Sequence, residues 1–493
     1  MRRVFQGFES MMETRFKRLA CGAIATFGVA LLGVSACSAQ VNEQHVQRVV
    51  PSSQAELTMS FSPLVKQAAP AVVNVFTTKV VKQNTSPFAN DPFFRRFFGD
   101  QMGGVPRERV ESSLGSGVIV GSDGVIVTNN HVVEGADEFK VVLSDRREYA
   151  AELLIADART DLAVLKIDTE GEKLPTLEIT GTRDVEVGDL VLAIGNPFGV
   201  GQTVTTGIIS AQARTDVGVS DYAFFLQTDA AINPGNSGGA LVDSHGRLVG
   251  VNTAIFSRSG GSNGIGFAIP SEMVKRVVDA AVNDGQIIRP WLGLKGQSVN
   301  AEIAKSMNLE RPMGVLITEI YPDGPVEKAG LKRGDLVTQI DGREVFDERG
   351  LKFLAATLAP GEKVTLDYMR SGKLKSVKVT LSPPPGATKA EMALIEGNTP
   401  FSGAEVADLS PALADELGRD PFASGVLVNR VLGRSLASRF GLRPGDMVRE
   451  VNGKVIKTSK ELLDIIEGKG GRGSTWAITI ERNGRRISSN VRM

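Results

Sequence analysis

The sequence predicts a mainly β protein of several domains, in which an all-β sandwich or barrel precedes two copies of a smaller domain. Between about Phe61 and Pro270, short apolar runs alternate with turn residues, as in residues 117–127. Regularly spaced short strands with turns between them are typical of a sandwich or barrel. Residues 314–345 then align without gaps to residues 425–456, at an offset of 111 residues. A period of this length indicates duplicated domains and not a solenoid.

The two copies also share a hairpin signal. Asp341-Gly342 in the first copy matches Asn452-Gly453 in the second, and both dipeptides favour a type I′ turn. A proline-rich stretch separates the copies. We therefore expect a first repeat domain over 289–382, a linker over 383–398 and a second repeat domain over 399–493.

Composition sets limits on the function. The 493 residues allow about three domains at ~100–200 residues each. Lysine plus arginine (56) balances aspartate plus glutamate (56), so charge gives no support for a nucleic-acid partner. The chain also lacks the GxxxxGK[ST] pattern of a phosphate-binding loop. We expect no cofactor and no metal.

The first 39 residues are typical of an export signal. A basic stretch at residues 15–18 precedes an apolar run from Leu19 to Val34, and small residues follow. That run is shorter than the ~20 residues of a membrane-spanning helix. An uncleaved anchor helix is the alternative interpretation. The polar residues 40–60 are expected to form a tether.

Both cysteines of the chain, Cys21 and Cys37, lie in this N-terminal segment. The remaining chain therefore has no disulfide, no thiol nucleophile and no cysteine-based metal site. Cys37 follows Val34-Ser35-Ala36, which is similar to a bacterial lipoprotein cleavage box. Acylation of Cys37, which would tether the protein to a membrane, is a hypothesis.

Histidine chemistry has few candidates, because the chain has only three histidines. His45 lies in the polar tether, and His245 lies in a turn between two apolar runs. His131 is placed differently, since it directly follows the apolar run that ends at Val127-Thr128. A residue at the end of a strand is held by a rigid scaffold. His131 is therefore the candidate general base.

Ser237 is the candidate nucleophile. A serine hydroxyl needs a base to take its proton, and imidazole suits that role near neutral pH. Glycines surround Ser237 in residues 233–240 and allow a sharp turn that brings backbone amides close to a substrate carbonyl. The amides of Gly235 and Ser237, with Asn236 as a further candidate, would form an oxyanion hole. One such donor is worth about 3 kcal/mol in acyl transfer.

Asp161 is the first choice for the carboxylate that orients the histidine, because it begins the apolar run Leu162–Ile167. Asp157 and Asp229 are the alternatives. The order His, Asp, Ser along the chain is that of the chymotrypsin class. Together, His131, Asp161 and Ser237 predict a serine endoprotease.

At these residues the sequence resembles the HtrA/Deg family of Do-like bacterial serine proteases. The resemblance rests on TNNHVV (128–133), DLAVLK (161–166) and QTDAAINPGNSGGALV (227–242), and it extends from about residue 60 to the C-terminus. It implies a chymotrypsin-like double β-barrel over 61–288 and PDZ domains in the two repeats. It also implies a periplasmic protein of the stress response and of protein quality control, which degrades unfolded or misfolded envelope proteins without ATP.

The resemblance assigns further roles to single residues. It implies an activation relay at Arg214, and assembly into trimers or larger cages through a phenylalanine-bearing insert at 84–112. The implied specificity pocket comprises Thr253, Ala254, Ile255, Phe256 and Ser257. The loop implied to capture the C-terminus of a peptide comprises Trp291, Leu292, Gly293 and Leu294.

Two questions stay open at this stage. The chain is alternatively a holdase chaperone or a peptide-binding scaffold with a resting protease domain. In the second repeat domain, Phe401-Ser-Gly-Ala404 takes the place of the peptide-capturing loop with a looser match. That domain binds peptide or serves assembly.

Finally, Ser271 is expected to be the N-cap of a helix that reaches about Val282, because Val274, Val277 and Val278 would lie on one apolar face.

Overall fold

The computed structural model describes residues 60–83, 107–182, 185–196, 201–214, 224–233, 235–255, 262–386, 392–469 and 475–493. The predicted signal segment with Cys37, nearly all of the tether, and residues 84–106 of the predicted insert lie outside the described residues.

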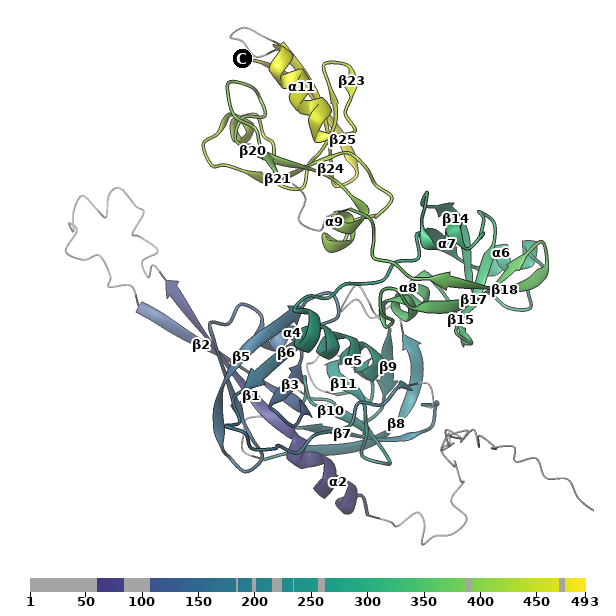
Figure 1. The fold of residues 1–493 in the computed structure, drawn as a ribbon. Helices are drawn as coiled ribbons and strands as arrows, with labels where there is room; N and C mark the ends of the chain where they lie inside the picture. The colour runs from purple at the N-terminus through teal and green to yellow at the C-terminus, as the bar shows by residue number, and fades with distance from the viewer. Residues whose placement is uncertain are drawn as a thin grey trace, which may run out of the picture. The chain divides into compact units, whose positions relative to one another are not determined.

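Two closed antiparallel barrels come first along the described chain (Figure 1), which confirms the prediction of a double β-barrel. Closure of each sheet on itself leaves no long unpaired edge. The first barrel pairs, in order, β1 (Val72–Gln83), β2 (Arg107–Gly121), β3 (Val125–Thr128), β6 (Leu162–Ile167), β5 (Glu148–Asp157) and β4 (Glu138–Val142). The second pairs β10 (Ala240–Asp243), β11 (Leu248–Ile255), β12 (Gly266–Pro270), β9 (Phe225–Thr228), β8 (Thr203–Arg214) and β7 (Leu190–Gly195).

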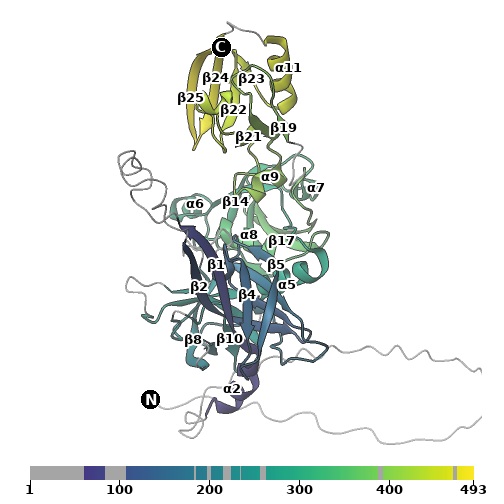
Figure 2. The same cartoon turned by 90° about the vertical axis from the view of Figure 1, so that its left-hand side faces the viewer.

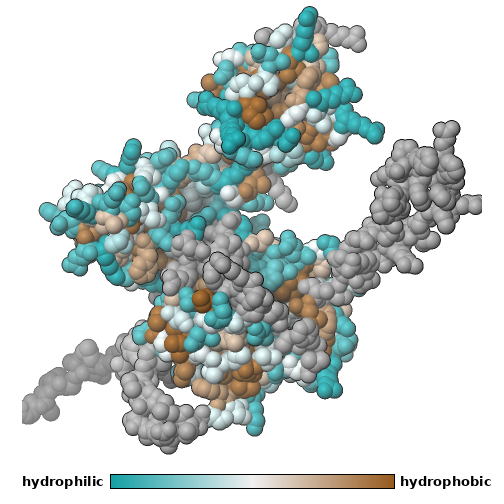
Figure 3. All heavy atoms as spheres, turned by 180° about the vertical axis from the view of Figure 1, so that it is seen from behind, coloured by the Kyte–Doolittle hydropathy of each residue, from teal (hydrophilic) through white to brown (hydrophobic). Residues whose placement is uncertain are grey.

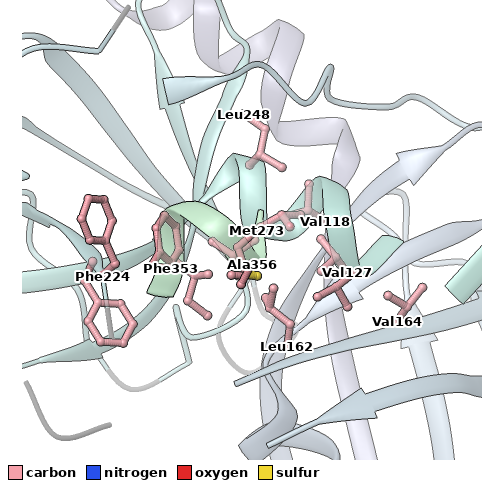
Figure 4. Close-up of a cluster of buried hydrophobic side chains, with 14 of the residues drawn as sticks. Val118, Val127, Leu162, Val164, Phe224, Leu248, Met273, Phe353 and Ala356 are labelled. Carbon is pink, nitrogen blue, oxygen red and sulfur yellow. The ribbon is translucent and has the colours of Figure 1, made fainter. Parts of the chain in front are cut away.

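The short strands are apolar because both of their faces are covered. All four residues of β3 are buried, as are five of the six residues of β6. Val127 pairs with Val164 across these strands and with Val118 on the other side. Figure 4 shows these side chains within a buried cluster that also includes Leu162 and Met273. The continuous apolar pattern therefore reflects burial on both faces.

Helix α5 (Ser271–Asp279) follows β12, close to the predicted position. Its N-cap is Pro270, however, and a π-helical turn (Ala280–Asp284) continues it. The prediction that Ser271 is the N-cap is wrong. Ser271 is fully buried and its hydroxyl donates to the carbonyl of Thr180, so a tertiary hydrogen bond replaces the local cap. The other helical segments of the described residues are α2 (Ser62–Ala68), a 3-10 turn at Ala69–Ala71, α4 (Asn130–Val133), α6 (Ala301–Ser306), α7 (Pro325–Lys328), α8 (Glu348–Ala356), α9 (Pro411–Glu416), α10 (Leu436–Arg439) and α11 (Ser459–Lys469).

The duplicated sequence gives two sheets that share one strand order, with β19 as an additional strand at one edge of the second, which confirms the two repeat domains. In Figure 2, β22, β24 and β25 of the second sheet lie side by side. The first sheet comprises β13 (Leu294–Ser298), β14 (Val315–Ile320), β15 (Leu336–Ile340), β17 (Lys363–Arg370) and β18 (Lys373–Thr380), with β16 (Arg343–Glu344) paired to β15. The second comprises β19 (Ala393–Leu394), β20 (Ala404–Asp408), β21 (Val426–Val431), β22 (Met447–Val451), β24 (Thr475–Arg482) and β25 (Arg485–Arg492), with β23 (Lys454–Val455) paired to β22.

The two hairpin signals behave as predicted. Asp341, Gly342, Asn452 and Gly453 all have positive φ, between 47° and 79°, as a type I′ turn requires. The start of the second sheet differs from the expectation. β19 lies within the segment 383–398 that was expected to be a linker, because Ile395 is 2% exposed and joins the core of that domain.

A buried ion pair recurs in both repeat domains. Asp335 is 1% exposed and accepts two hydrogen bonds of 2.6 Å from Arg370, while Asp446 is fully buried and is bonded in the same way by Arg482. Burial alone would raise the pKa of Asp335. The bonds from Arg370 and from the Lys332 N–H outweigh burial and hold this pKa below its ordinary value. The charged form of Asp335 therefore stabilises the fold.

On the face seen in Figure 3, hydrophobic patches lie between hydrophilic residues. No helix among the described residues is long and apolar enough to cross a membrane.

We predict that Asp335→Ala destabilises the first repeat domain by about 3 kcal/mol, because it leaves Arg370 and the Lys332 N–H without their buried acceptor. Hydrogen exchange of the β15 amides measures this loss. The control is Asp123→Ala, which breaks a similarly short pair with Lys166 (2.5 Å) at a carboxylate that is 69% exposed. That change should lower the local free energy of unfolding by less than about 1 kcal/mol.

The same pair gives a pH dependence. Because the folded pKa of Asp335 is lowered, its contribution is complete above the unfolded value of about 3.9 and is lost as the pH falls through the folded value. The protection of β15 should therefore fall in this acid range in the wild type. An equal fall in Asp335→Ala would contradict the assignment.

Candidate active site

The site is built where β3 of the first barrel ends. Thr128 is the last residue of β3, Asn129 is the N-cap of the short helix α4, and His131 lies in the first turn of that helix. The N–H of Asn130 and the side-chain amide of Asn129 both donate to the carbonyl of Asp161, at 3.1 and 3.0 Å. These two bonds attach the start of α4 to the residue before β6.

Asp161 has a backbone conformation that few residues adopt. Its φ is 57°, in the left-handed region, which aspartate tolerates better than most residues with a Cβ. The paired carbonyl described above holds this conformation. Asp161 is also only 5% exposed, so its carboxylate needs hydrogen-bond donors from the protein.

His131 supplies two of these donors. Its ring Nδ1 lies 2.9 Å from both carboxylate oxygens of Asp161, and its backbone N–H donates to Oδ1 at 3.1 Å. A carboxylate at Nδ1 favours the tautomer with the proton on Nδ1, which leaves a lone pair on Nε2. The histidine side chain is 46% exposed, so that lone pair is accessible from solvent. The geometry is that of an oriented general base.

Thr253 supplies the third donor, and the sequence did not indicate this role. Its hydroxyl donates to Oδ2 of Asp161 at 2.5 Å, and its carbonyl accepts the Ser237 hydroxyl at 3.2 Å. The side chain is almost fully buried. The family resemblance implies that Thr253 belongs to the specificity pocket. Thr253 also contacts two of the triad candidates, Asp161 and Ser237.

The structure brings Ser237 into the same site from the second barrel. Its hydroxyl donates to the Thr253 carbonyl. Among the described residues, it forms no hydrogen bond with the ring of His131. Catalytic hydrogen bonds often form only when substrate is bound, so this arrangement is compatible with a nucleophile and its base.

The loop that carries Ser237 is held by its own backbone bonds. The Asn236 N–H donates to the Asn233 carbonyl, and the Gly239 N–H donates to the Asn236 carbonyl, both at 3.0 Å. Gly235 and Gly238 have φ of 98° and 81°, which favours glycine. Because the Asn236 N–H already has an acceptor, the loop favours Gly235 and Ser237 over Asn236 as oxyanion donors.

The alternative carboxylates are bonded elsewhere. Asp157 accepts the Thr160 hydroxyl at 2.6 Å and the Arg289 guanidinium at 2.5 Å. Asp229 accepts the Ile208 N–H at 2.7 Å. His245 lies exposed in the turn between β10 and β11 and is 3.8 Å from Asp243. Among the described residues, only Asp161 contacts the ring of His131 through a carboxylate.

The other sequence-predicted residues are described only in part. Ala254 and Ile255 end strand β11, and Arg214 ends β8, but their side chains lie outside the described part. Phe256 and Ser257 lie entirely outside it. Among the described residues, no group of three or more His, Cys, Asp or Glu side chains is placed to hold a metal ion.

The predicted peptide-capturing loop precedes the edge strand β13. The Trp291 N–H donates to the Ser382 carbonyl at 2.8 Å, and the carbonyls of Leu292 and Gly293 accept the N–H groups of Val326 and Tyr321. Gly293 has a φ of 73°, and an added Cβ would come within 3.1 Å of Pro325 Cδ. Leu294 then starts β13, which among the described strands pairs only with β14. No described strand covers its other edge, and Lys295 of β13 forms an ion pair with Asp420 of the second repeat domain at 2.6 Å.

Comparison with known proteins places these features in a family. The profile of the trypsin-like peptidase domain matches residues 115–251, and PDZ domain profiles match residues 290–381 and 427–473. The chain is 41% identical to a probable periplasmic serine endoprotease, DegP-like, of Marinomonas sp. (strain MWYL1), over 82% of this chain and 87% of the relative. It is 35% identical to the periplasmic serine endoprotease DegP of Salmonella typhimurium, over 94% and 97%. A solved structure of the HtrA-type protease AlgW with a tripeptide matches at 43% identity and a TM-score of 0.50, over 67% of this chain and 99% of that one.

We predict that Gly238→Ala slows the labelling of Ser237 by a fluorophosphonate probe by at least about 10²-fold, since displacement of reacting groups by about 1 Å has effects of that size. An added Cβ at Gly238 would come within 2.1 Å of the Ser116 carbonyl oxygen. The matched control is Gly171→Ala, which has a similar φ of 87° but nothing within 4 Å of the added atom. Equal labelling rates in the two variants would show that the close approach is unimportant.

Proposed function

Since the chain belongs to the DegP-like, HtrA-type family and is a serine endoprotease with PDZ domains, we propose that Ser237 is its nucleophile, His131 its general base and Asp161 the residue that orients the base. The observation that carries the proposal is the His131–Asp161 pair, with Nδ1 at 2.9 Å from both oxygens, set beside the Ser237 hydroxyl through their shared contact with Thr253.

The proposed reaction uses these groups in a fixed sequence. The Ser237 hydroxyl turns from the Thr253 carbonyl toward His131, gives its proton to Nε2, and its oxygen attacks the carbonyl carbon of the scissile bond. The amides of Gly235 and Ser237 stabilise the resulting oxyanion. His131 then gives the proton to the leaving amine, and water hydrolyses the acyl-enzyme by the same steps. Asp161 stays ionised and stabilises the imidazolium.

We propose that the substrates are unfolded or misfolded proteins of the cell envelope. Support comes from the relatives, which are named periplasmic serine endoproteases. A protease without a phosphate-binding loop depends on substrates that are already unfolded, because it has no ATP-driven step to unfold them. We propose that the protein acts in protein quality control during stress and that chaperone activity is a further role. The alternative of a scaffold with a resting protease domain is not favoured.

We also propose that the first PDZ domain binds the C-terminal segment of a polypeptide. The peptide would pair with the open edge of β13 and lie beside α8, with its carboxylate at the Trp291–Leu294 loop. Buried Leu292 and Leu351 give this groove an apolar lining. Peptide is present in the related AlgW structure, which supports this class of ligand. The second PDZ domain has a looser loop at Phe401–Ala404, and we assign it to peptide binding or assembly.

The remaining proposals concern segments that the structure describes in part or not at all. They are domain bounds at 61–288 and 289–382, with a second PDZ domain that runs from β19 (Ala393–Leu394) to residue 493. They also include a specificity pocket at 253–257 with an activation relay at Arg214, and assembly into trimers or larger cages through 84–112. The last is a lipid anchor at Cys37 after removal of the signal segment. Light scattering of the purified protein and mass spectrometry of its mature N-terminus test the assembly and the anchor.

We predict that Ser237→Ala lowers the rate of casein degradation by about 10⁴-fold or more, because the nucleophile is lost. Asp161→Asn should have an effect of about 10⁴-fold, because it changes the histidine tautomer. The controls Ser244→Ala and His245→Ala alter exposed residues of the same barrel and should leave the rate unchanged. Casein degradation by Ser237→Ala at the wild-type rate would refute the triad, and retained suppression of aggregation by this variant would support the chaperone role.

We predict that a labelled peptide with a free C-terminal carboxylate binds at least about tenfold more tightly than its amidated form, because charge-assisted hydrogen bonds contribute about 1.5–3 kcal/mol. Fluorescence anisotropy measures both affinities. Gly293→Ala should weaken binding of the free acid. The matched control Gly372→Ala has the same φ of 73° with nothing within 4 Å of the added atom, and should bind normally. Equal binding of the acid and the amide would contradict carboxylate capture.

A further inference from the structure

We propose that Ser116, on β2 of the first barrel, is a positioning residue for the oxyanion hole in the second barrel. Its hydroxyl donates to the Gly235 carbonyl at 2.6 Å, and through this bond it holds the peptide that follows one oxyanion donor and precedes the other. The inference rests on the proposed function, because it takes Ser237 as the nucleophile and the amides of Gly235 and Ser237 as the donors.

The three polar groups of Ser116 form four hydrogen bonds around this loop. The backbone N–H donates to the Ser237 carbonyl at 2.8 Å, and the backbone carbonyl accepts the Thr128 hydroxyl at 2.7 Å. The hydroxyl oxygen accepts the Asn196 N–H at 2.8 Å and donates to Gly235. Ser116 is fully buried, so water does not compete for these bonds.

The direction of the hydroxyl bond is fixed by its neighbours. A serine hydroxyl has one proton, and it can donate or accept at each partner. The Asn196 N–H can only donate, and the Gly235 carbonyl can only accept. The hydroxyl proton of Ser116 must therefore point at the Gly235 carbonyl. The Asn196 N–H and the Gly235 carbonyl together determine the orientation of the Ser116 hydroxyl. This removes the rotational freedom that usually makes a serine an imprecise donor.

The bond fixes the plane of the Gly235–Asn236 peptide. The carbonyl end of that peptide is held by Ser116, and its N–H end is held by the Asn233 carbonyl at 3.0 Å. The next peptide is held through the Asn236 carbonyl, which accepts the Gly239 N–H. Because glycine allows many backbone angles, Gly235 needs such an external constraint to keep the peptide that follows it, and with it the approach to the Ser237 amide, in one orientation.

The surroundings leave little room for the loop to shift. An added Cβ at Gly238 would come within 2.1 Å of the Ser116 carbonyl, and one at Gly195 would come within 2.4 Å of the Asn236 side-chain oxygen. The loop is thus packed directly on the segments that hold Ser116 and Asn196. Preorganised donors act without reorganisation at the moment of reaction, which is the main source of oxyanion stabilisation.

Loss of the Ser116 hydroxyl should therefore affect the transition state more than substrate binding. In the full-length protein, Ser116→Ala is expected to lower kcat by about 10–10²-fold, up to the effect of losing one oxyanion donor, with KM changed by less than about threefold. A fluorogenic peptide that the wild-type protein cleaves provides the assay. The affinity of a peptide aldehyde, which forms an oxyanion with the enzyme, should fall by the same factor as kcat.

Thr182→Val is the matched control. Thr182 is another buried residue of the same part of the chain, and its hydroxyl donates to Glu272 Oε2 at 2.5 Å on α5. This change removes a buried hydroxyl bond without contact with the nucleophile loop, so it should lower the thermal midpoint and leave kcat unchanged. If Ser116→Ala is not recovered folded, Ser116→Cys replaces it, because a thiol of similar size is a weak donor.

Different results would overturn the role of Ser116, its link to the oxyanion hole, and the proposed function. An unchanged kcat in Ser116→Ala, or an equal loss of kcat in Thr182→Val, would overturn the role of Ser116. A fall in kcat with no loss of aldehyde affinity would overturn the link to the oxyanion hole. Cleavage of the same peptide by Ser237→Ala would instead overturn the proposed function, whatever the behaviour of Ser116.

Discussion

The site depends on the contact between two barrels, since the candidate base and carboxylate come from the first and the candidate nucleophile from the second. The Ser116 N–H and the Ser237 carbonyl join them at 2.8 Å, and Thr253 reaches back from β11 to Asp161 at 2.5 Å. Asn74 adds a third link through its side-chain amide, which donates to the Asn196 carbonyl at 2.5 Å. These buried bonds hold the two barrels together at the place of the proposed proton transfer, and the hydrogen-bonded strands close each barrel independently of them.

Asp161 shows how the fold supports an unfavourable arrangement. The residue combines a left-handed backbone with a buried carboxylate, and each of these alone is destabilising. The two problems share one solution. The carbonyl accepts the amides of Asn129 and Asn130, and the carboxylate accepts the N–H and ring of His131 together with the Thr253 hydroxyl. The short helix α4 provides most of these donors, so the segment that presents the base also stabilises its partner.

The parts of this site that the sequence could predict are those that depend on contacts between residues close together in the sequence. His131, Asp161 and Ser237 could be predicted because their side chains are suited to catalysis and their local sequences form strand ends and a glycine-rich turn. The hairpins at Asp341 and Asn452 were accessible because a type I′ turn is decided within two residues. Ser116 and the hydroxyl contact of Thr253 were not, since their partners lie 119 and 92 residues away. Ser271 was misassigned for the same reason: a distant carbonyl, that of Thr180, replaced the local cap.

The two repeat domains share a buried ion pair that stabilises the fold and differ in the loop that is proposed to bind peptide in the first copy. The buried Asp–Arg pair occurs in both copies, at Asp335 and Arg370 and again at Asp446 and Arg482, and in both it joins the start of one central strand to the end of its neighbour. The loops before the corresponding strands β13 and β20 differ, with Trp291–Leu294 in one copy and Phe401–Ala404 in the other, and β20 is not at the edge of its sheet because β19 pairs with it. Removal of the buried carboxylate leaves a guanidinium without its ion-pair partner in either domain, which destabilises the fold of that copy. These loops have no such structural constraint, so the two copies differ at the loop and at the sheet edge where the proposed peptide would bind in the first copy.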